Sequence, residues 1–169
     1  MPKLNATQIQ QKYKEHLHAT LLDFSCMGLK DVQIPINWSD NGINRNSSNN
    51  DKGEIYELYI GSLYKSEGYD VIPTGGSNDM GIDLLCRQGN NYVICIQCKY
   101  RTDKGLGVKD IFEFYGACKY YASQHLNETV SGAFWTTQRF NKGTKMFRVA
   151  ESLGIKFFSG VLLPKDFQC

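Results

Sequence analysis

The sequence predicts an α/β fold in which helices flank a mixed β-sheet. The main observation is the order of its apolar patterns, which from Asp51 onward alternate as α-β-β-β-α-β-α-β. A second observation is the length of 169 residues, which suits one domain with a substantial buried core. We expect residues 51–169 to form this domain, and residues 1–50 to form a helical extension with a polar loop.

The N-terminal part is expected to hold one helix before the main domain. From Thr7 to Met27 apolar residues recur on one helical face, and Gly28 fits a helix end. The stretch NWSDNGINRNSSNNDKG is rich in Asn, Ser, Asp and Gly and therefore predicts a loop. Asp51, followed by Glu54, then resembles a capping box that begins a helix ending at Gly68.

Three strands are expected next, with the last two joined by a tight turn. The strand candidates are YDVIPT, IDLLCR and YVICIQCKYR, and the segments between them are GGSNDMG and QGNN. Strands joined by such a short turn pair antiparallel. This pairing brings Asp83, at the start of the second of these strands, within reach of Gln97 and Lys99 on the third.

Two helices and two strands complete the predicted fold. A helix is expected from about Val108 to Ala122, followed by a strand in GAFWTT, a helix in NKGTKMFRVAESLG and a strand in IKFF. The apolar face of the first of these helices consists of Val108, Ile111, Phe112, Tyr115 and Cys118.

Composition narrows the class of protein. A net charge of +2 does not by itself indicate a nucleic-acid partner. The chain has no apolar run of the roughly 20 residues that span a bilayer, and its N-terminus lacks the apolar stretch of a signal peptide. We therefore expect no membrane partner, a cytoplasmic or other reducing intracellular compartment, and six reduced cysteines.

The segment ICIQCKY contains two competing motifs. Side chains alternate along a strand, so Gln97 and Lys99 share one face while Cys98 points to the other. Cys95 and Cys98 then face opposite sides, which argues against a metal or redox use of this CxxC spacing. We expect both to be buried thiols.

A lysine in an apolar strand requires a partner or a function. The simpler interpretation is a structural ion pair between Lys99 and Asp83. The functional interpretation is a hydrolytic site, in which oxygens of Asp83, Gln97 and the Cys98 backbone carbonyl bind Mg²⁺, or Mn²⁺ in its place. Lys99 would then position water or stabilise charge on a phosphate.

Several motifs in order resemble the PD-(D/E)XK nuclease superfamily, and more narrowly its Mrr-like restriction endonuclease branch. GID at 81–83 followed by IQCK at 96–99 is similar to the D…QxK variant of the family motif. GEIYE, EGYDV, GGSNDMGIDL, FYGA and GAFWTTQRF extend the resemblance over roughly residues 51–158. The resemblance implies a restriction-endonuclease-like core, αβββαβ with an added helix and strand, and a nuclease domain over residues 51–169.

The resemblance also implies roles for the residues that match. Asp83 would be the central metal-binding aspartate, with Asp79 as a competing position. Gln97 stands where the family usually has an acid, and Lys99 is the motif lysine. Glu57, on the first core helix, would be the additional catalytic acid that orients either the water or the metal. Because Gln97 is a neutral amide, we expect weak metal affinity until substrate phosphate supplies a ligand.

DNA is the expected partner, and cations near the site would bind its phosphates. These cations are Arg101, Lys104, Lys109, Arg139 and Lys142. Each group of cations also fits a merely solvated surface. A homodimer and a separate specificity or effector partner are both compatible with the sequence.

The leading functional hypothesis is a Mg²⁺-dependent deoxyribonuclease, a DNA endonuclease of the restriction or defence type. One alternative is a structure-selective repair or Holliday-junction-resolving nuclease, which needs no recognition domain. An alternative of another class is a non-catalytic nucleic-acid-binding module on a nuclease-like fold.

Overall fold

A computed structural model describes residues 49–74, 80–101 and 105–162. These residues form two compact units, 49–68 and 69–162. The predicted N-terminal helix, most of the polar loop and the tail from residue 163 lie outside the described residues. The predicted domain boundary at residue 50 stays a prediction. No helix within the described ranges is long and apolar enough to cross a membrane.

The described part of the first unit consists of helix α2 (Asn49–Ser66) and its C-terminal turn. Asp51 lies within the helix, so the prediction that it begins the helix was wrong. Asn and Asp are well tolerated around a helix start because their side chains can bond to exposed backbone N–H groups. The predicted end is confirmed, since Gly68 has a φ of +84° that suits glycine. The large buried side chains of α2 are Tyr56, Tyr59, Ile60, Leu63 and Tyr64.

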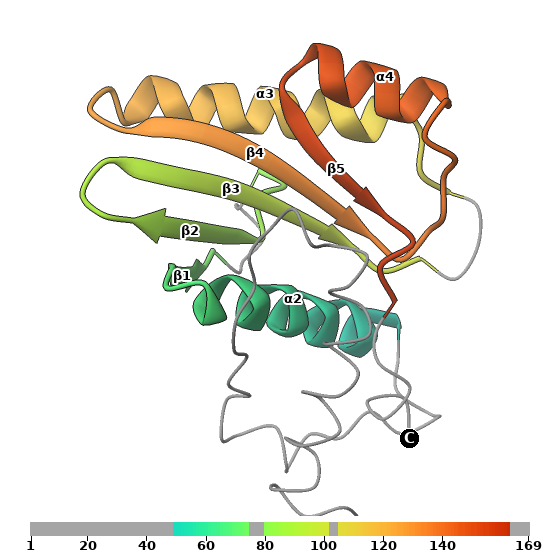
Figure 1. Ribbon diagram of the computed structural model, residues 1–169, viewed down its shortest axis with the longest axis horizontal. Helices are drawn as coiled ribbons and strands as arrows, with labels where there is room; N and C mark the ends of the chain where they lie inside the picture. Colours follow the sequence, from blue (N-terminus) through green and yellow to red (C-terminus); the bar gives the residue numbers. More distant parts are fainter. Residues whose placement is uncertain (1–48, 75–79, 102–104, 163–169) are drawn as a thin grey trace, which may run out of the picture. The chain divides into compact units, whose positions relative to one another are not determined.

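The second unit is built on a five-stranded sheet with the strand order β1-β2-β3-β4-β5. The strands are β1 (Asp70–Pro73), β2 (Leu84–Gln88), β3 (Tyr92–Lys99), β4 (Thr129–Thr136) and β5 (Ile155–Ser159). β1, β2 and β3 pair antiparallel, whereas β3, β4 and β5 pair parallel (Figure 1). The predicted mixed sheet and the predicted order of helices and strands are confirmed.

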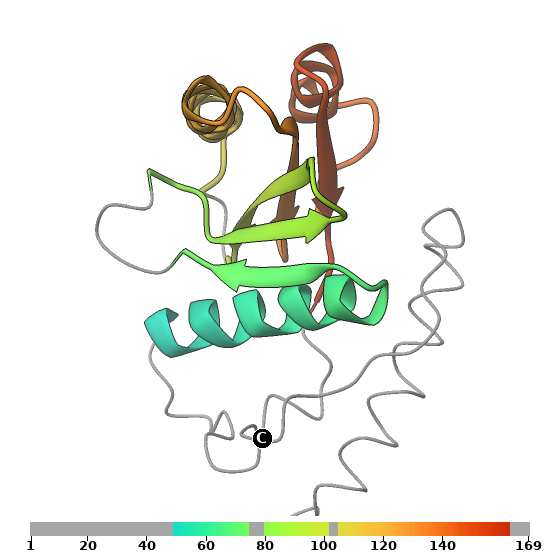
Figure 2. The ribbon, with the colours of Figure 1, turned by 90° about the vertical axis from the view of Figure 1, so that its left-hand side faces the viewer.

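Helices α3 (Val108–Gln124) and α4 (Lys145–Ser152) provide the crossovers between the parallel strands. Figure 2 shows them side by side over the same face of the sheet. A parallel pair requires such a crossover, because a short turn can reverse the chain only into an antiparallel neighbour. This arrangement puts the carboxyl ends of β3, β4 and β5 together at one end of the sheet.

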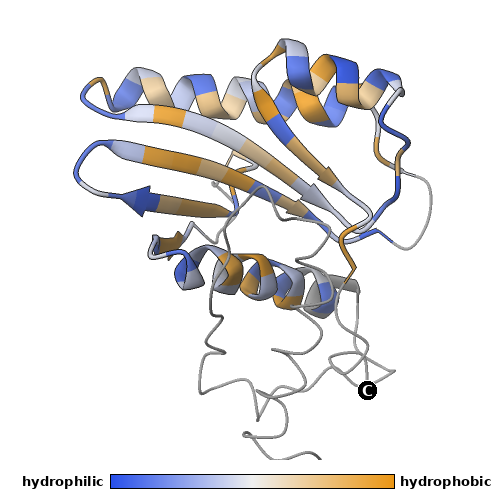
Figure 3. Cartoon of the chain, viewed as in Figure 1, coloured by the Kyte–Doolittle hydropathy of each residue, from blue (hydrophilic) through white to orange (hydrophobic). Residues whose placement is uncertain are grey.

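Strand β3 lies in the middle of the sheet and is buried on both faces from Val93 to Cys98. Figure 3 shows the resulting hydrophobic run along β3. On the face of the sheet that α3 and α4 cover, Cys95 packs with Ile111 and Phe114 of α3. Phe112, which we expected in that core, is 53% exposed. Ile111, Phe114 and Cys118 follow the helical spacing, and Phe112 lies about 100° away from Ile111 around the helix.

The prediction that Cys95 and Cys98 are buried thiols is confirmed. Cys86, Cys95, Cys98 and Cys118 are free and buried in the described part of the chain. Cys95 contacts the Cys118 thiol, and this hydrogen bond together with burial raises the pKa of the Cys95 thiol far above its usual range. A thiol held protonated in this way is a poor nucleophile and a poor metal ligand.

Gly132 allows α3 and β5 to approach β4 closely. It lies opposite Cys95 in the β3–β4 ladder. A Cβ at this position would stand 2.5 Å from Ile155 Cδ1, 3.1 Å from Cys118 Sγ and 3.3 Å from Phe114 Cε1. The small residue is therefore required by packing and not by backbone conformation.

We predict that Gly132→Ala lowers the free energy of unfolding by about 1–3 kcal/mol, because the added methyl group overpacks this core. Urea unfolding measures the change. The matched control is Gly116→Ala on α3, where an added Cβ meets nothing within 4 Å. Alanine should stabilise this helical position by roughly 0.5–1 kcal/mol. Equal effects of the two substitutions would contradict the packing role of Gly132.

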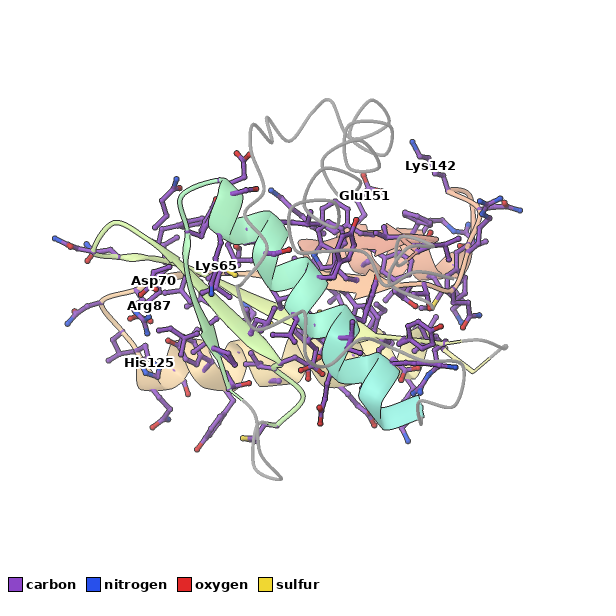
Figure 4. All side chains as sticks on the ribbon, turned by 90° about the horizontal axis from the view of Figure 1, so that it is seen from below. Lys65, Asp70, Arg87, His125, Lys142 and Glu151 are labelled. Carbon is purple, nitrogen blue, oxygen red and sulfur yellow. The ribbon has the colours of Figure 1, made fainter. Side chains whose placement is uncertain are left out.

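A polar cluster closes the opposite end of the sheet, where the β2–β3 hairpin turns. Arg87 donates to Glu128 Oε1 through Nη1 and to the Tyr121 hydroxyl through Nη2, the latter over 2.8 Å. The Tyr121 hydroxyl donates to Glu128 Oε2 over 2.9 Å, and the Tyr121 ring stacks on His125. Figure 4 shows Arg87 and His125 near one another at this end, together with Asp70. The cluster ties β2 to the end of α3.

The hydrogen bond from Arg87 lowers the pKa of Glu128 below its ordinary value. A carboxyl with a lowered folded-state pKa contributes stability above its unfolded pKa of about 4.3 and loses it as the pH falls through the folded value. We predict that Glu128→Gln reduces the free energy of unfolding by about 1 kcal/mol at pH 7. The difference from wild type should shrink below about pH 4. Urea unfolding over a pH series measures it.

Glu113→Gln is the control for this prediction. Glu113 pairs with Lys109 at 3.4 Å on the exposed surface of α3. Exposed pairs of this kind contribute little to stability, so its difference from wild type should stay close to zero. A Glu128→Gln difference that does not change with pH would show that the carboxylate charge has no role.

Candidate active site

The predicted site residues lie where β2 begins beside the end of β3. Asp83 immediately precedes β2 and is not part of the strand itself. Its N–H donates to the Ile96 carbonyl over 2.8 Å, and its carbonyl accepts from the Thr74 N–H over 3.0 Å. Thr74 also donates through its hydroxyl to the Ile82 carbonyl. The backbone at Asp83 is therefore held from both sides.

The Asp83 carboxylate is oriented by the backbone of β3. The Cys98 N–H donates to Asp83 Oδ2 over 2.6 Å. A backbone N–H bonded to a carboxylate is one of the stronger hydrogen bonds in proteins. Successive residues of a strand direct their backbone groups to opposite edges, so the Cys98 carbonyl also points toward the β2 edge of β3. The carboxylate and this carbonyl consequently belong to one edge of the sheet.

Gln97 is buried at 6% exposure and, by strand alternation, shares the face of β3 with Cys95, which packs against α3. Its amide lies against the turn that carries Asp83. Gly81 has a φ of +85°, and a Cβ there would stand 3.0 Å from Gln97 Nε2. Gly81 thus allows the Asp83 turn to approach the Gln97 side chain. Gly81 was not among the predicted site residues, although its place in the GID motif was a signal.

Lys99 is the last residue of β3 and is partly exposed. By strand alternation it shares a face with Gln97. Its carbonyl accepts from the Thr137 N–H over 3.3 Å, at the end of the parallel ladder between β3 and β4. Asp83, Gln97 and Lys99 are therefore brought to one end of β3, as the hairpin predicted.

Of the other predicted site residues, the structure describes some and not others. Glu57 lies on α2 in the first unit and is partly buried. Asp79 and Lys104 lie outside the described residues. Arg101 follows β3, and Lys109 lies in the first turn of α3.

The two remaining predicted cations, Arg139 and Lys142, follow β4. Both are exposed, as are Arg101 and Lys109. The four described cations come after the carboxyl ends of β3 and β4, and Figure 4 shows Lys142 at the opposite end of the unit from Arg87. Lys109 is also paired with Glu113.

The donor atoms at the Asp83 edge suit a hard cation. They comprise one carboxylate, one amide and one backbone carbonyl, and oxygen donors of these kinds are those that Mg²⁺ prefers. Among the described residues, no group of three His, Cys, Asp or Glu side chains could hold a metal ion. A site with a single carboxylate in the second unit would therefore depend on neutral oxygens for its other protein ligands.

The fold and this arrangement define an α/β protein of the restriction-endonuclease-like class. Residues 49–165 match a family model described as a restriction endonuclease, of the Mrr catalytic type. The match covers more than half of the chain, which therefore belongs to the Mrr-type restriction endonuclease family. The predicted resemblance is confirmed, and this part of the chain is a restriction-endonuclease-like nuclease domain.

A further similarity covers a shorter stretch. The chain is 32% identical over 71 residues to a UPF0102 protein of Colwellia psychrerythraea. This stretch is 41% of the present chain and 54% of the relative. The chain therefore spans about half the length of this relative.

We predict that Gly81→Ala displaces the Gln97 side chain, because the new Cβ would press on Nε2. The side-chain amide resonances of Gln97 in an NMR spectrum should shift. Gly89→Ala is the matched control, since Gly89 also has a positive φ of +64° but nothing lies within 4 Å of an added Cβ. Both substitutions should cost about 1–2 kcal/mol of stability through the backbone. Unchanged Gln97 resonances in Gly81→Ala would contradict the contact.

Proposed function

We propose that this domain is a metal-dependent DNA endonuclease that hydrolyses phosphodiester bonds, of the restriction or defence type. The observation that carries the proposal is the hydrogen bond from the Cys98 amide to Asp83 Oδ2. This bond directs the carboxylate to the end of β3 that bears Gln97 and Lys99. Membership in the restriction endonuclease family supports the same chemistry.

The proposed roles follow from the chemistry of each group. Asp83, the Gln97 amide oxygen and the Cys98 carbonyl would hold Mg²⁺ or Mn²⁺, and Glu57 is proposed as an additional acid. The bound cation would supply Lewis-acid activation of a phosphoryl oxygen and of water. Lys99 orients the attacking water and stabilises the negative charge that develops on the phosphate.

Gln97 gives the proposed site a distinctive property. An amide oxygen carries no formal charge and binds a divalent cation more weakly than a carboxylate does. The phosphate of the substrate would then supply the missing negative charge. Metal and DNA would consequently bind with positive coupling, each raising the affinity of the site for the other.

DNA binding is proposed for the cations that follow β3 and β4. Arg101, Arg139 and Lys142 are exposed and can therefore contact phosphates. Lys109 must exchange its pairing with Glu113 for a phosphate contact. Lys104 belongs to the same sequence cluster and is included on that basis.

We predict that Asp83→Ala and Lys99→Ala each lower the rate of DNA cleavage on the order of 10²–10³-fold, because each removes a group that stabilises the transition state. Supercoiled plasmid, linear DNA, branched DNA and RNA are incubated with Mg²⁺, Mn²⁺ or EDTA. Cleavage that survives both substitutions would overturn the site. Preferred cleavage of branched DNA would indicate a junction-resolving enzyme, and DNA binding without cleavage would indicate a non-catalytic module.

We predict that Gln97→Glu tightens Mn²⁺ binding about tenfold in the absence of DNA, since ligand charge governs affinity for hard cations. Isothermal titration calorimetry measures the change. Gln88→Glu is the control, because it adds the same charge at an exposed position at the far end of β2. Equal Mn²⁺ affinity of wild type and Gln97→Glu would argue against Gln97 as a ligand.

A further inference from the structure

The end of the β3–β4 ladder is completed by a side chain instead of a strand. The last paired residues are Lys99 and Thr136. Beyond them, the Thr137 hydroxyl accepts the Arg101 N–H over 2.8 Å and donates to the Arg101 carbonyl over 2.9 Å. One hydroxyl therefore satisfies both backbone groups of Arg101.

The position of Arg101 explains why this contact resembles strand pairing. Alternate residues of β3 direct their backbone groups toward β4, as the bond between the Lys99 carbonyl and the Thr137 N–H shows. Arg101 is next in this alternation. If the ladder continued, its N–H and carbonyl would meet the backbone of β4. The Thr137 hydroxyl takes the place of that backbone where the strands separate.

Thr137 is itself held firmly. Its side chain is buried at 7% exposure, and its neighbour Thr136 is fully buried. The Thr136 hydroxyl accepts the Gln138 N–H over 3.0 Å, and the Thr136 carbonyl accepts the Val161 N–H over 3.1 Å. The Gln138 side chain accepts the Leu106 N–H over 3.3 Å. The Thr136–Gln138 segment is thus fixed to the end of β5 and to the approach to α3.

We propose that Thr137 is a positioning residue for Lys99, and that it acts by fixing the backbone on the C-terminal side of the lysine. This inference rests on the proposed nuclease function. Lys99 lies between two fixed points, the Asp83–Cys98 bond before it and the Thr137–Arg101 bonds after it. Without the second point, the chain after Lys99 would lose the two bonds that tie the Arg101 backbone to Thr137. The same two hydrogen bonds fix the backbone of Arg101, which is proposed to contact DNA.

The test compares wild type with Thr137→Val and Thr137→Ser. Valine has nearly the shape of threonine but cannot form either hydrogen bond, whereas serine retains the hydroxyl. Ser131→Ala is the matched control, because the Ser131 hydroxyl bonds with the Tyr92 hydroxyl at 3.1 Å between the same two strands at their other end. Thr137→Ala replaces the valine variant if that variant does not fold, as judged by its thermal unfolding.

Two readouts are needed. In Thr137→Val, hydrogen exchange of the Arg101 amide should accelerate at least about tenfold, since its acceptor is lost. The kcat of plasmid cleavage should fall on the order of 10–100-fold, by more than KM rises, because misplaced catalytic groups slow the chemical step. Thr137→Ser should restore both values, and Ser131→Ala should change neither.

The outcomes separate this inference from the proposed function. A wild type that cleaves no nucleic acid overturns the nuclease proposal and the positioning role with it. A wild type that cleaves, with Thr137→Val equally active, overturns the positioning role alone. Unchanged exchange at the Arg101 amide also overturns it, whatever the activity. A loss of activity that serine does not rescue would assign Thr137 a packing role.

Discussion

The central constraint on the second unit is that β3 pairs antiparallel on one edge and parallel on the other. The backbone groups of β3 point alternately to these two edges, so each residue near its carboxyl end can hydrogen-bond with only one of the neighbouring strands, β2 or β4. The Cys98 N–H points to the β2 edge and bonds with the Asp83 carboxylate. The backbone groups of Lys99 and Arg101 point to the β4 edge and bond with Thr137. The side chains of Gln97 and Lys99 are thereby presented between two anchored edges.

Burial of β3 on both faces strengthens this arrangement. A strand covered on both faces resists shifts in register, since a slip by one residue would move every buried side chain to the other face. Gly132 allows α3 to lie close to the sheet beside Cys95, and Gly81 allows the Asp83 turn to lie close to Gln97. The site is therefore supported by a rigid core, which suits chemistry that depends on position.

The two ends of the sheet are organised differently. At the hairpin end, Arg87, Tyr121 and Glu128 satisfy one another within a partly buried cluster. At the carboxyl end of the parallel strands, Arg101, Arg139 and Lys142 remain exposed. Charges that are paired with one another contribute to stability, and exposed cations can interact with phosphate. This contrast accounts for a chain whose net charge is only +2 and which is still proposed to bind DNA.

The sequence by itself determined the order of the elements, the hairpin that brings Asp83 to Gln97 and Lys99, and the opposite faces of Cys95 and Cys98. These features depend on local periodicity and short turns, which a single chain displays directly. The helical pattern wrongly placed Phe112 in the core, and the sequence did not assign roles to Gly81 and Thr137. The contacts of Gly81 and Thr137 join residues distant in sequence, such as Arg101 and Thr137, so only the tertiary structure could show them. Two adjacent threonines at a strand end were a signal of buried polar side chains, but the partner that satisfies a hydroxyl is set by packing.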